Sequence, residues 1–502
     1  MKEPGPIPGD LSPLAAGAFD AAAARHLLNR AGFGGTPAQV DALAAMGLDR
    51  AVDLLVDYGM QPEDPVAPDD FDRDLMPPLG REERQELAKA RRDRDEEAVE
   101  RLERKENQAR AADRRQLAEL KKWWLRRMIE TARPLEEKMT LFWHGHFATG
   151  ARTVENSWHM FQQNHLFRTH ATGNFATLAL NVIRDPAMLR YLDNHQSRRG
   201  RPNENLAREL LELFILGEGN GYTEADIKAG ARALTGYTFD DDDFVFRRQN
   251  HDDGPKEILG KRGNWNGDDF ATLALERTEC SRFLCGKLYR YLVNDTPSGD
   301  LPEAHRRAAA GAVGAMARQL RDAQYDVKPV LARLFRSAHF HHPANRGTLI
   351  KSPVQAVVQT VRQFGTPPRR LSALVGACDL MGQDLFQPPN VKGWDGGRAW
   401  INTATMFVRQ NVAVYLLTGR RPDMYDWELD ERPFDATPLV AGATAPGDVA
   451  DRLLGLALAA PPHPERRAAI ARFLAAQPSA ASNASVVAAL ELVTALPEYQ
   501  LA

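Results

Sequence analysis

Apolar residues recur at helical spacing along most of the chain. In residues 203–216, Leu206, Leu210, Leu213 and Phe214 fall on one face when the chain is given 3.6 residues per turn. The same spacing recurs at residues 38–46, 48–58, 135–143, 283–291, 304–321, 327–337 and 353–364. The pattern predicts a mainly α protein built as a multi-helix bundle.

Residues 237–269 have a different pattern. Thr238 and Phe239, and then Phe244, Val245 and Phe246, alternate as the residues of a short strand or hairpin do. Turns rich in Asp, Asn and Gly surround them. We therefore expect a small β-hairpin or irregular insertion between two helical subdomains.

A chain of 502 residues is too long for one simple core, so we expect two to three subdomains. The predicted division is a loose lead-in (1–17), an N-terminal helical subdomain (18–236), the insertion (237–270), a second helical subdomain (271–430) and a C-terminal helical cap (431–502).

Residues 81–122 form a run of mixed charges with few apolar positions. Glu and Arg or Lys recur three and four residues apart, a spacing that lets opposite charges pair along an exposed helix. We expect a long charged helix that protrudes from the body and can project as a hairpin arm. A solvated helix and a partner-binding arm both fit this pattern.

Composition excludes several classes of function. A charged fraction of 26% with a net charge of −3 argues against a general nucleic-acid binder or a membrane-surface protein. No apolar run reaches the roughly 18 residues that a membrane span needs. Residues 1–20 lack the basic start and apolar core of a signal peptide, so we expect a cytoplasmic protein or one whose leader has been removed.

The helix expected at 203–216 carries a carboxylate in an apolar setting. Glu204 and Arg208 are four residues apart and can pair on the surface. Glu209 lies between Leu213 and Leu216 on the helical projection, so we expect it to be shielded. A shielded carboxylate has a raised pKa that suits a general acid or base, or it is held by a cation.

His144 and His146 flank Gly145 among aromatic residues. On a strand or turn both imidazoles can reach one divalent metal ion, whereas on a regular helix they splay apart. Gly145 indicates that the helix before it ends there, which favours the metal pair. The alternative is that both histidines bind backbone groups within an aromatic core.

Residues 387–400 form a long loop without a helical period. Trp394 and Trp400 can stack on sugar rings or other flat apolar faces. The equally weighted alternative is that they hold the loop on the helical body.

A set of spaced motifs resembles the large bacterial "domain of unknown function 1800" family over roughly residues 22–420, and over the tail as well. The motifs are residues 25–34 (RHLLNRAGFG), 143–147 (WHGHF), 185–189 (DPAML), 203–214 (NENLARELLELF), 232–236 (RALTG), 351–353 (KSP) and the loop 388–400. The resemblance implies an exported protein, periplasmic or extracellular, often with a twin-arginine leader. It also implies a sulfatase-like partner of the alkaline-phosphatase superfamily, and no established activity.

Two functional hypotheses follow. In the first, the protein is a hydrolase- or lyase-like enzyme acting on a polysaccharide or other extracellular polymer. Glu209 is then the general acid or base, assisted by His144 and His146 or by a divalent metal that they hold. Substrate contacts come from Asn194, His195, Asn205, Arg208, Trp394 and Trp400. In the second, it is a non-enzymatic binding or assembly protein at the cell surface that works with the sulfatase-like partner.

Overall fold

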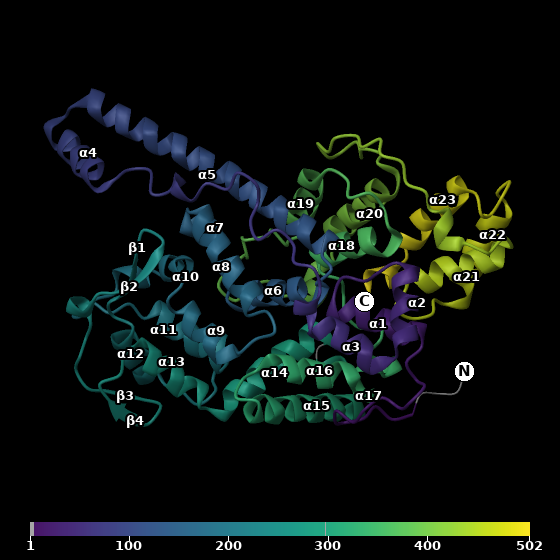
Figure 1. The fold of residues 1–502 in the computed structure, drawn as a ribbon, viewed down its shortest axis with the longest axis horizontal. Helices are drawn as coiled ribbons and strands as arrows, with labels where there is room; N and C mark the ends of the chain where they lie inside the picture. The colour runs from purple at the N-terminus through teal and green to yellow at the C-terminus, as the bar shows by residue number, and fades with distance from the viewer. Residues whose placement is uncertain (1–4, 297) are drawn as a thin grey trace.

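The structure, a computed structural model, describes residues 5–296 and 298–502. Within these residues, 23 α-helices make up most of the fold, and the strands form two antiparallel hairpins (Figure 1). The hairpins pair β1 (Tyr237–Asp240) with β2 (Asp243–Phe246), and β3 (Lys256–Ile258) with β4 (Lys261–Gly263). This confirms the predicted mainly α class with a small β insertion.

The largest hydrophobic core gathers helices from the first two thirds of the chain. It runs from Leu11 to Phe340 and centres on buried aromatic residues such as Trp143 and Phe214. The contributing helices are α1 (Ala21–Ala31), α2 (Pro37–Met46), α3 (Leu48–Val56), α6 (Pro134–His146), α8 (Ser157–Thr169), α9 (Phe175–Val182), α10 (Pro186–Tyr191), α11 (Asn205–Glu209), α12 (Glu224–Ala233), α13 (Gly267–Leu275), α14 (Thr278–Leu292), α15 (Glu303–Asp322), α16 (Val327–Arg336) and α17 (Ala338–His341).

The body contains two further hydrophobic cores. The second joins Trp124 and its neighbours in α5 (Glu96–Glu130) to α7 (Ala151–Val154), α18 (Pro353–Phe364), α19 (Leu371–Leu380) and α20 (Thr403–Thr418). The third is formed mainly by α21 (Pro446–Ala457), α22 (Pro464–Ala475) and α23 (Asn483–Thr494), which lie together at one end of the molecule (Figure 1). The subdomain boundaries expected at 236, 270 and 430 remain a prediction.

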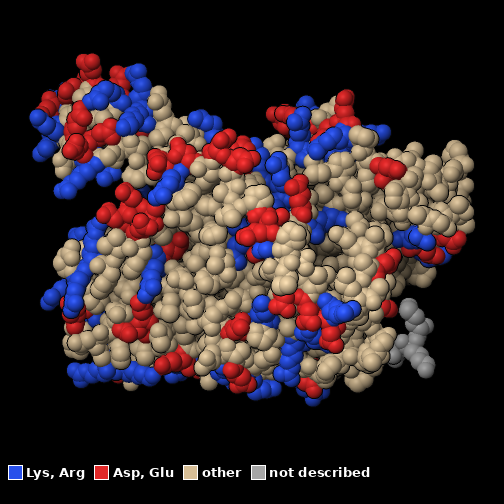
Figure 2. Space-filling view, in the orientation of Figure 1, with Lys and Arg blue, Asp and Glu red and all other residues tan. Residues whose placement is uncertain are grey.

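The charged stretch forms an arm of two antiparallel helices, α4 (Arg81–Asp93) and the first part of α5, that protrudes from the body (Figure 1). Figure 2 shows acidic and basic atoms crowded together on it. Pairs such as Arg91–Glu103, at 2.9 Å, link its two helices. Leu87 and Leu102 add a small apolar contact between them. The predicted protruding charged helix is confirmed, and it folds back on itself as a hairpin.

A buried carboxylate joins the base of the arm to the body. Glu137 of α6 is 0% exposed and accepts hydrogen bonds from Trp124 Nε1 at 2.9 Å and Arg168 Nε at 2.7 Å. Arg127 also donates to it. Burial by itself would raise the pKa of Glu137, but Arg168 and Arg127 together lower it. These four side chains, the Glu137 cluster, therefore tie α5, α6 and α8 together around a charged group.

None of the described helices combines the length and apolar character needed to cross a lipid bilayer.

The Glu137 cluster gives a test of the fold. Glu137→Gln removes the negative charge and leaves Arg168 buried without a carboxylate, while Arg127 keeps its longer contact with Glu136 at 3.3 Å, so we expect the free energy of unfolding to fall by about 3–5 kcal/mol. Urea denaturation measures this change. Glu130→Gln, an exposed position on α5, is the matched control and should change it by less than about 0.5 kcal/mol. Equal effects of the two substitutions would contradict the view that the Glu137 cluster holds α5, α6 and α8 together.

Candidate functional site

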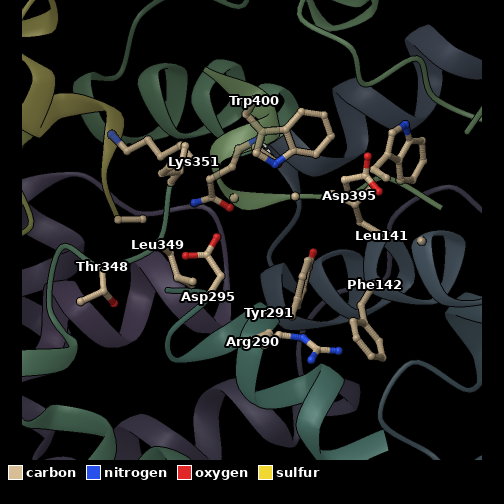
Figure 3. A pocket seen from close by; sticks show the side chains of 18 of the residues that line it. Leu141, Phe142, Arg290, Tyr291, Asp295, Thr348, Leu349, Lys351, Asp395 and Trp400 are labelled. Carbon is tan, nitrogen blue, oxygen red and sulfur yellow. Dashed lines mark hydrogen bonds between the residues drawn. The ribbon is translucent and has the colours of Figure 1, made fainter. Parts of the chain in front are cut away.

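A cavity of about 810 Å³ opens between α6, α14 and two loops, 347–352 and 392–400 (Figure 3). Its volume lies in the range of pockets that bind small molecules. Figure 3 shows Trp400 above the cavity, Tyr291 and Arg290 below it, and the carboxylates of Asp295 and Asp395 on different sides. The cavity therefore collects side chains from segments far apart in the sequence.

Helix α6 supplies one wall because its sequence presents two different faces. Lys138, Leu141, Phe142 and Gly145 follow the i, i+3, i+4, i+7 spacing of one helical face, and all four line the cavity. Glu137 belongs to the Glu137 cluster on the side facing α5 and α8. The buried ion cluster thus fixes the helix whose other face forms the cavity wall.

The loop 387–400 approaches α6 very closely. A Cβ atom at Gly393 would collide with the backbone carbonyl of Gly145, and Gly393 also has a φ of +86°. Only glycine tolerates both conditions. This contact brings Trp394 to the end of α6, where its ring lies beside Gly145. Trp394 and Trp400 both line the cavity, as the saccharide-stacking hypothesis requires, and Trp394 also packs against the second core.

The wall of the cavity carries an excess of positive charge. Its basic residues are Arg30, Lys138, Lys287, Arg290, Lys351, Lys392 and Arg398, and its acidic side chains are Asp295 and Asp395. In the described part of the chain, Arg398 makes an ion pair, with Asp300 at 2.8 Å, and the other six make none. Unpaired like charges around one space repel each other, and a bound anion relieves that repulsion.

Two of these lysines are deeply buried. Lys138 is 7% exposed, and its ammonium group donates to Gln355. Lys351 is 1% exposed, and its Nζ lies 3.8 Å from the centroid of the Tyr499 ring. Burial, reinforced by nearby arginines, lowers the pKa of each to about 7. A buried ammonium without a carboxylate is unfavourable by several kcal/mol, so these positions need an explanation beyond packing.

The central helix, residues 205–215, differs from the single regular helix expected at 203–216. It is α-helical over Asn205–Glu209 and continues as a π-helix over Leu210–Ile215. Carbonyl groups near a helix end lack intrahelical partners, and two of them bind cavity residues. Phe214 O accepts from His146 Nε2 at 2.9 Å, and Leu213 O accepts from Lys287 Nζ at 3.3 Å.

The structure separates the two histidines of the predicted His144–His146 metal pair. Helix α6 does not end at Gly145 but continues to His146, so the two rings splay apart. His144 lies against Trp124 and accepts from Asn164 Nδ2 at 3.0 Å, whereas His146 faces the central helix. Burial lowers the pKa of both well below the usual value, so both are neutral. The described residues contain no group of three or more His, Cys, Asp or Glu arranged to hold a metal ion.

His146 nevertheless lines the cavity, whereas His144 does not. With Nε2 donating to Phe214 O, the buried Nδ1 of His146 is left as an acceptor, and it has no partner in the described residues. His146 is therefore the predicted catalytic residue that reaches the cavity.

The four predicted polar contact residues lie away from the cavity. Asn194 is buried and donates to the carbonyls of Leu234 and Tyr237, which fixes the start of β1. His195 Nδ1 donates to Leu189 O at 3.2 Å. Asn205 is exposed at the start of α11, and Arg208 pairs with Glu224 at 2.7 Å and Glu204 at 3.4 Å. These interactions are local or structural, and none of the four side chains lines the cavity.

Glu209 lies outside the cavity lining but close to its rim. It is half-buried, and burial followed by Glu212 raises its pKa, while Arg208 and Lys392 oppose the shift. No described side chain donates a hydrogen bond to its carboxylate. Glu209 is therefore shielded and has no fixed hydrogen-bond partner in the described part of the chain. Lys392, which lines the cavity, is near enough to lower its pKa.

Sequence reasoning missed the cavity residues Asp295, Tyr291 and Lys138. Tyr291 lies at the end of α14, Asp295 follows that helix and Lys138 lies in α6, and none of the sequence motifs contains them. Lys351 is part of the KSP motif, but that motif predicted only the start of a helix, which Ser352 caps and Pro353 begins. A lysine placed among apolar helix positions, as Lys138 is, was the available signal.

Fold and site define a mainly α protein with a basic, tryptophan-lined cavity. The chain belongs to the DUF1800 family, because the family model described as "Protein of unknown function (DUF1800)" matches residues 26–501. No curated protein and no solved structure matches the chain.

The structural importance of Glu209 can be compared with that of Glu137 through the free energy of unfolding. Because Glu209 has no hydrogen-bond partner among the described residues, Glu209→Gln should lower the free energy of unfolding by less than about 1 kcal/mol in urea denaturation. The corresponding change at Glu137 should be several-fold larger. A loss at Glu209 as large as that at Glu137 would show that Glu209 holds a buried partner and is structural.

Proposed function

We propose that the protein binds an anionic saccharide in the basic cavity, as an enzyme that cleaves such a polymer by hydrolysis or elimination. The ligand class is a sugar chain that carries carboxylate, sulfate or phosphate groups. The observation that carries the proposal is the set of six basic side chains around the cavity that have no ion-pair partner in the described residues.

Electrostatics favours an anion over a neutral ligand. Arg290 and Lys392 line the cavity and are exposed, while Lys138 and Lys351 are buried within its wall. Charges in a partly enclosed site interact more strongly than they do in bulk water, because fewer water molecules screen them. An anionic ligand would replace the missing carboxylates and relieve the cost of burying the lysines.

The tryptophans favour a ligand with rings. Trp400 is 7% exposed and forms part of the wall, and Trp394 is half-buried at the end of α6. Indole faces pack well against the apolar faces of sugar rings, and charged groups then fix the orientation of the ligand. A sugar chain with acidic substituents meets both requirements. An exported setting, which the family resemblance implies, would give access to such polymers.

The alternative, a non-enzymatic assembly protein with a sulfatase-like partner, relies on the charged arm. Much of the arm's charge is matched internally, as in Lys105–Glu83 and Arg101–Glu86, both at 2.5 Å. No comparable excess of unpaired charge favours a partner there. The cavity therefore supports the saccharide proposal more specifically.

The proposal predicts a charge-dependent affinity. Isothermal titration calorimetry with a heparin-derived hexasaccharide should detect binding that Arg290→Glu/Lys392→Glu weakens by about tenfold or more, equivalent to about 1.4 kcal/mol. Both side chains are exposed and lack ion pairs in the described residues, so the fold should be unaffected.

The matched control is Lys89→Glu/Arg318→Glu, which makes the same charge change at exposed positions outside the cavity lining. Its affinity should stay within about twofold of the unmodified protein. A neutral dextran of similar length should bind much more weakly. Equal weakening by both double substitutions would show that only net charge matters and would contradict a cavity site.

A further inference from the structure

We infer that Asp295 is the proton-carrying residue of the cavity. Binding of an anionic ligand takes up a proton from solvent at the Asp295 carboxyl group, and the protonated side chain donates a hydrogen bond to an oxygen of the ligand. The inference rests on the proposed function, because it specifies how that same cavity holds an acidic saccharide.

Asp295 is directed into the cavity. It follows α14, and Figure 3 shows its carboxylate pointing into the open space below Trp400, with Tyr291 beside it. The opposite loop comes so close that a Cβ atom at Gly397 would lie 3.1 Å from Asp295 Oδ2. The carboxylate therefore occupies a confined position within reach of anything that enters the cavity.

The carboxylate has no ion pair in spite of its basic surroundings. No described side chain donates a hydrogen bond to it. Arg30, the basic residue with the largest effect on it, instead donates to the backbone carbonyls of Val293 and Asn345 at 2.9 and 2.8 Å. A carboxylate that served only to neutralise the cavity would be expected to pair with one of its cations.

Burial and the surrounding charges have opposite effects on the pKa of Asp295. The other charged side chains that line the cavity are Arg30 of α1, Lys138 of α6, Lys287 and Arg290 of α14, Lys351 of the loop 347–352, and Lys392, Asp395 and Arg398 of the loop 392–400. Burial raises the pKa of Asp295 to about 6, while Arg30 lowers it. The effect of burial is the larger one, so the basic neighbours do not hold the group ionised as an ion pair would.

An anion entering the cavity must raise the pKa of Asp295 further, because two negative charges repel each other at short range. A group whose pKa lies near 6 in the free protein and higher in the complex takes up a proton on binding at neutral pH. Protonation changes the side chain from a group that repels an acidic saccharide into a hydrogen-bond donor. A pKa in this range also suits a residue that exchanges a proton with a bound substrate.

Proton uptake can be measured directly with the heparin-derived hexasaccharide as the probe. Calorimetric titrations at pH 7 in buffers of different ionisation enthalpy give the number of protons bound with the ligand. We expect a substantial uptake, up to about one proton per site from Asp295, and an affinity that falls by up to about tenfold per pH unit above pH 6.

Asp295→Asn should remove the share of the uptake that comes from Asp295, up to about one proton, and strengthen binding at pH 7.5, because it keeps a polar group without the charge. Lys138 and Lys351 also have pKa values of about 7, so their own uptake, up to about one proton together, should remain in the variant. Asp395→Asn is the matched control, since Asp395 lines the same cavity but is exposed, and it should leave the uptake unchanged. Asp295→Ser replaces Asp295→Asn if the latter lowers the melting temperature.

The outcomes separate the two proposals. If the hexasaccharide binds and Asp295→Asn takes up as many protons as the unmodified protein, the role of Asp295 is wrong and the saccharide site stands. If Asp295→Asn and Asp395→Asn lower the uptake equally, the effect belongs to the general potential of the cavity and the assignment is again wrong. If the hexasaccharide does not bind at any pH between 5 and 8, both the proposed function and the inference fail.

Discussion

The buried carboxylate of Glu137 is the constraint on which the arrangement of the cavity depends. It is fully enclosed, and it is held as a charged group by two arginines and an indole N–H from two neighbouring helices. Because a buried charge tolerates little change in its partners, it fixes both the position and the rotation of α6. The next residue, Lys138, then faces the cavity, and Gly145 near the end of the same helix contacts Gly393 of the loop 387–400.

The buried lysines of the cavity wall, unlike Glu137, have no partner of opposite charge among the described residues. Lys138 and Lys351 lie in the wall with an amide and an aromatic ring as neighbours instead of carboxylates. Such an arrangement is less stable than a neutral wall, and proteins keep unfavourable charges mainly where function requires them. The contrast between a matched ion cluster on one face of α6 and unmatched charge on the other is the physical basis of the proposed anion site.

Much of the fold could be predicted from the sequence, because helical periodicity and caps are local signals. The helices, the hairpin insertion, the charged arm and the Glu204–Arg208 pair all follow from spacings of three to four residues. The π-helix at Leu210–Ile215 does not, since it lies against α13 and α14, which are distant in sequence. Gly145 misled the helix prediction because its role is to admit the backbone of Gly393, a contact far away in sequence.

Only those residues of the candidate site that belong to local motifs could be predicted from the sequence. His146, Trp394 and Trp400 belong to recognisable local motifs, and the structure brings all three to the cavity. Asp295 and the unpaired basic residues come from several segments, and their importance depends on the partners they lack, which no sequence pattern records. A crystal structure with a bound heparin-derived hexasaccharide tests the central claim most directly. We predict density for the sugar between Trp394, Trp400 and Asp295. Density only on the arm, or a cavity unchanged at saturating ligand, would contradict it.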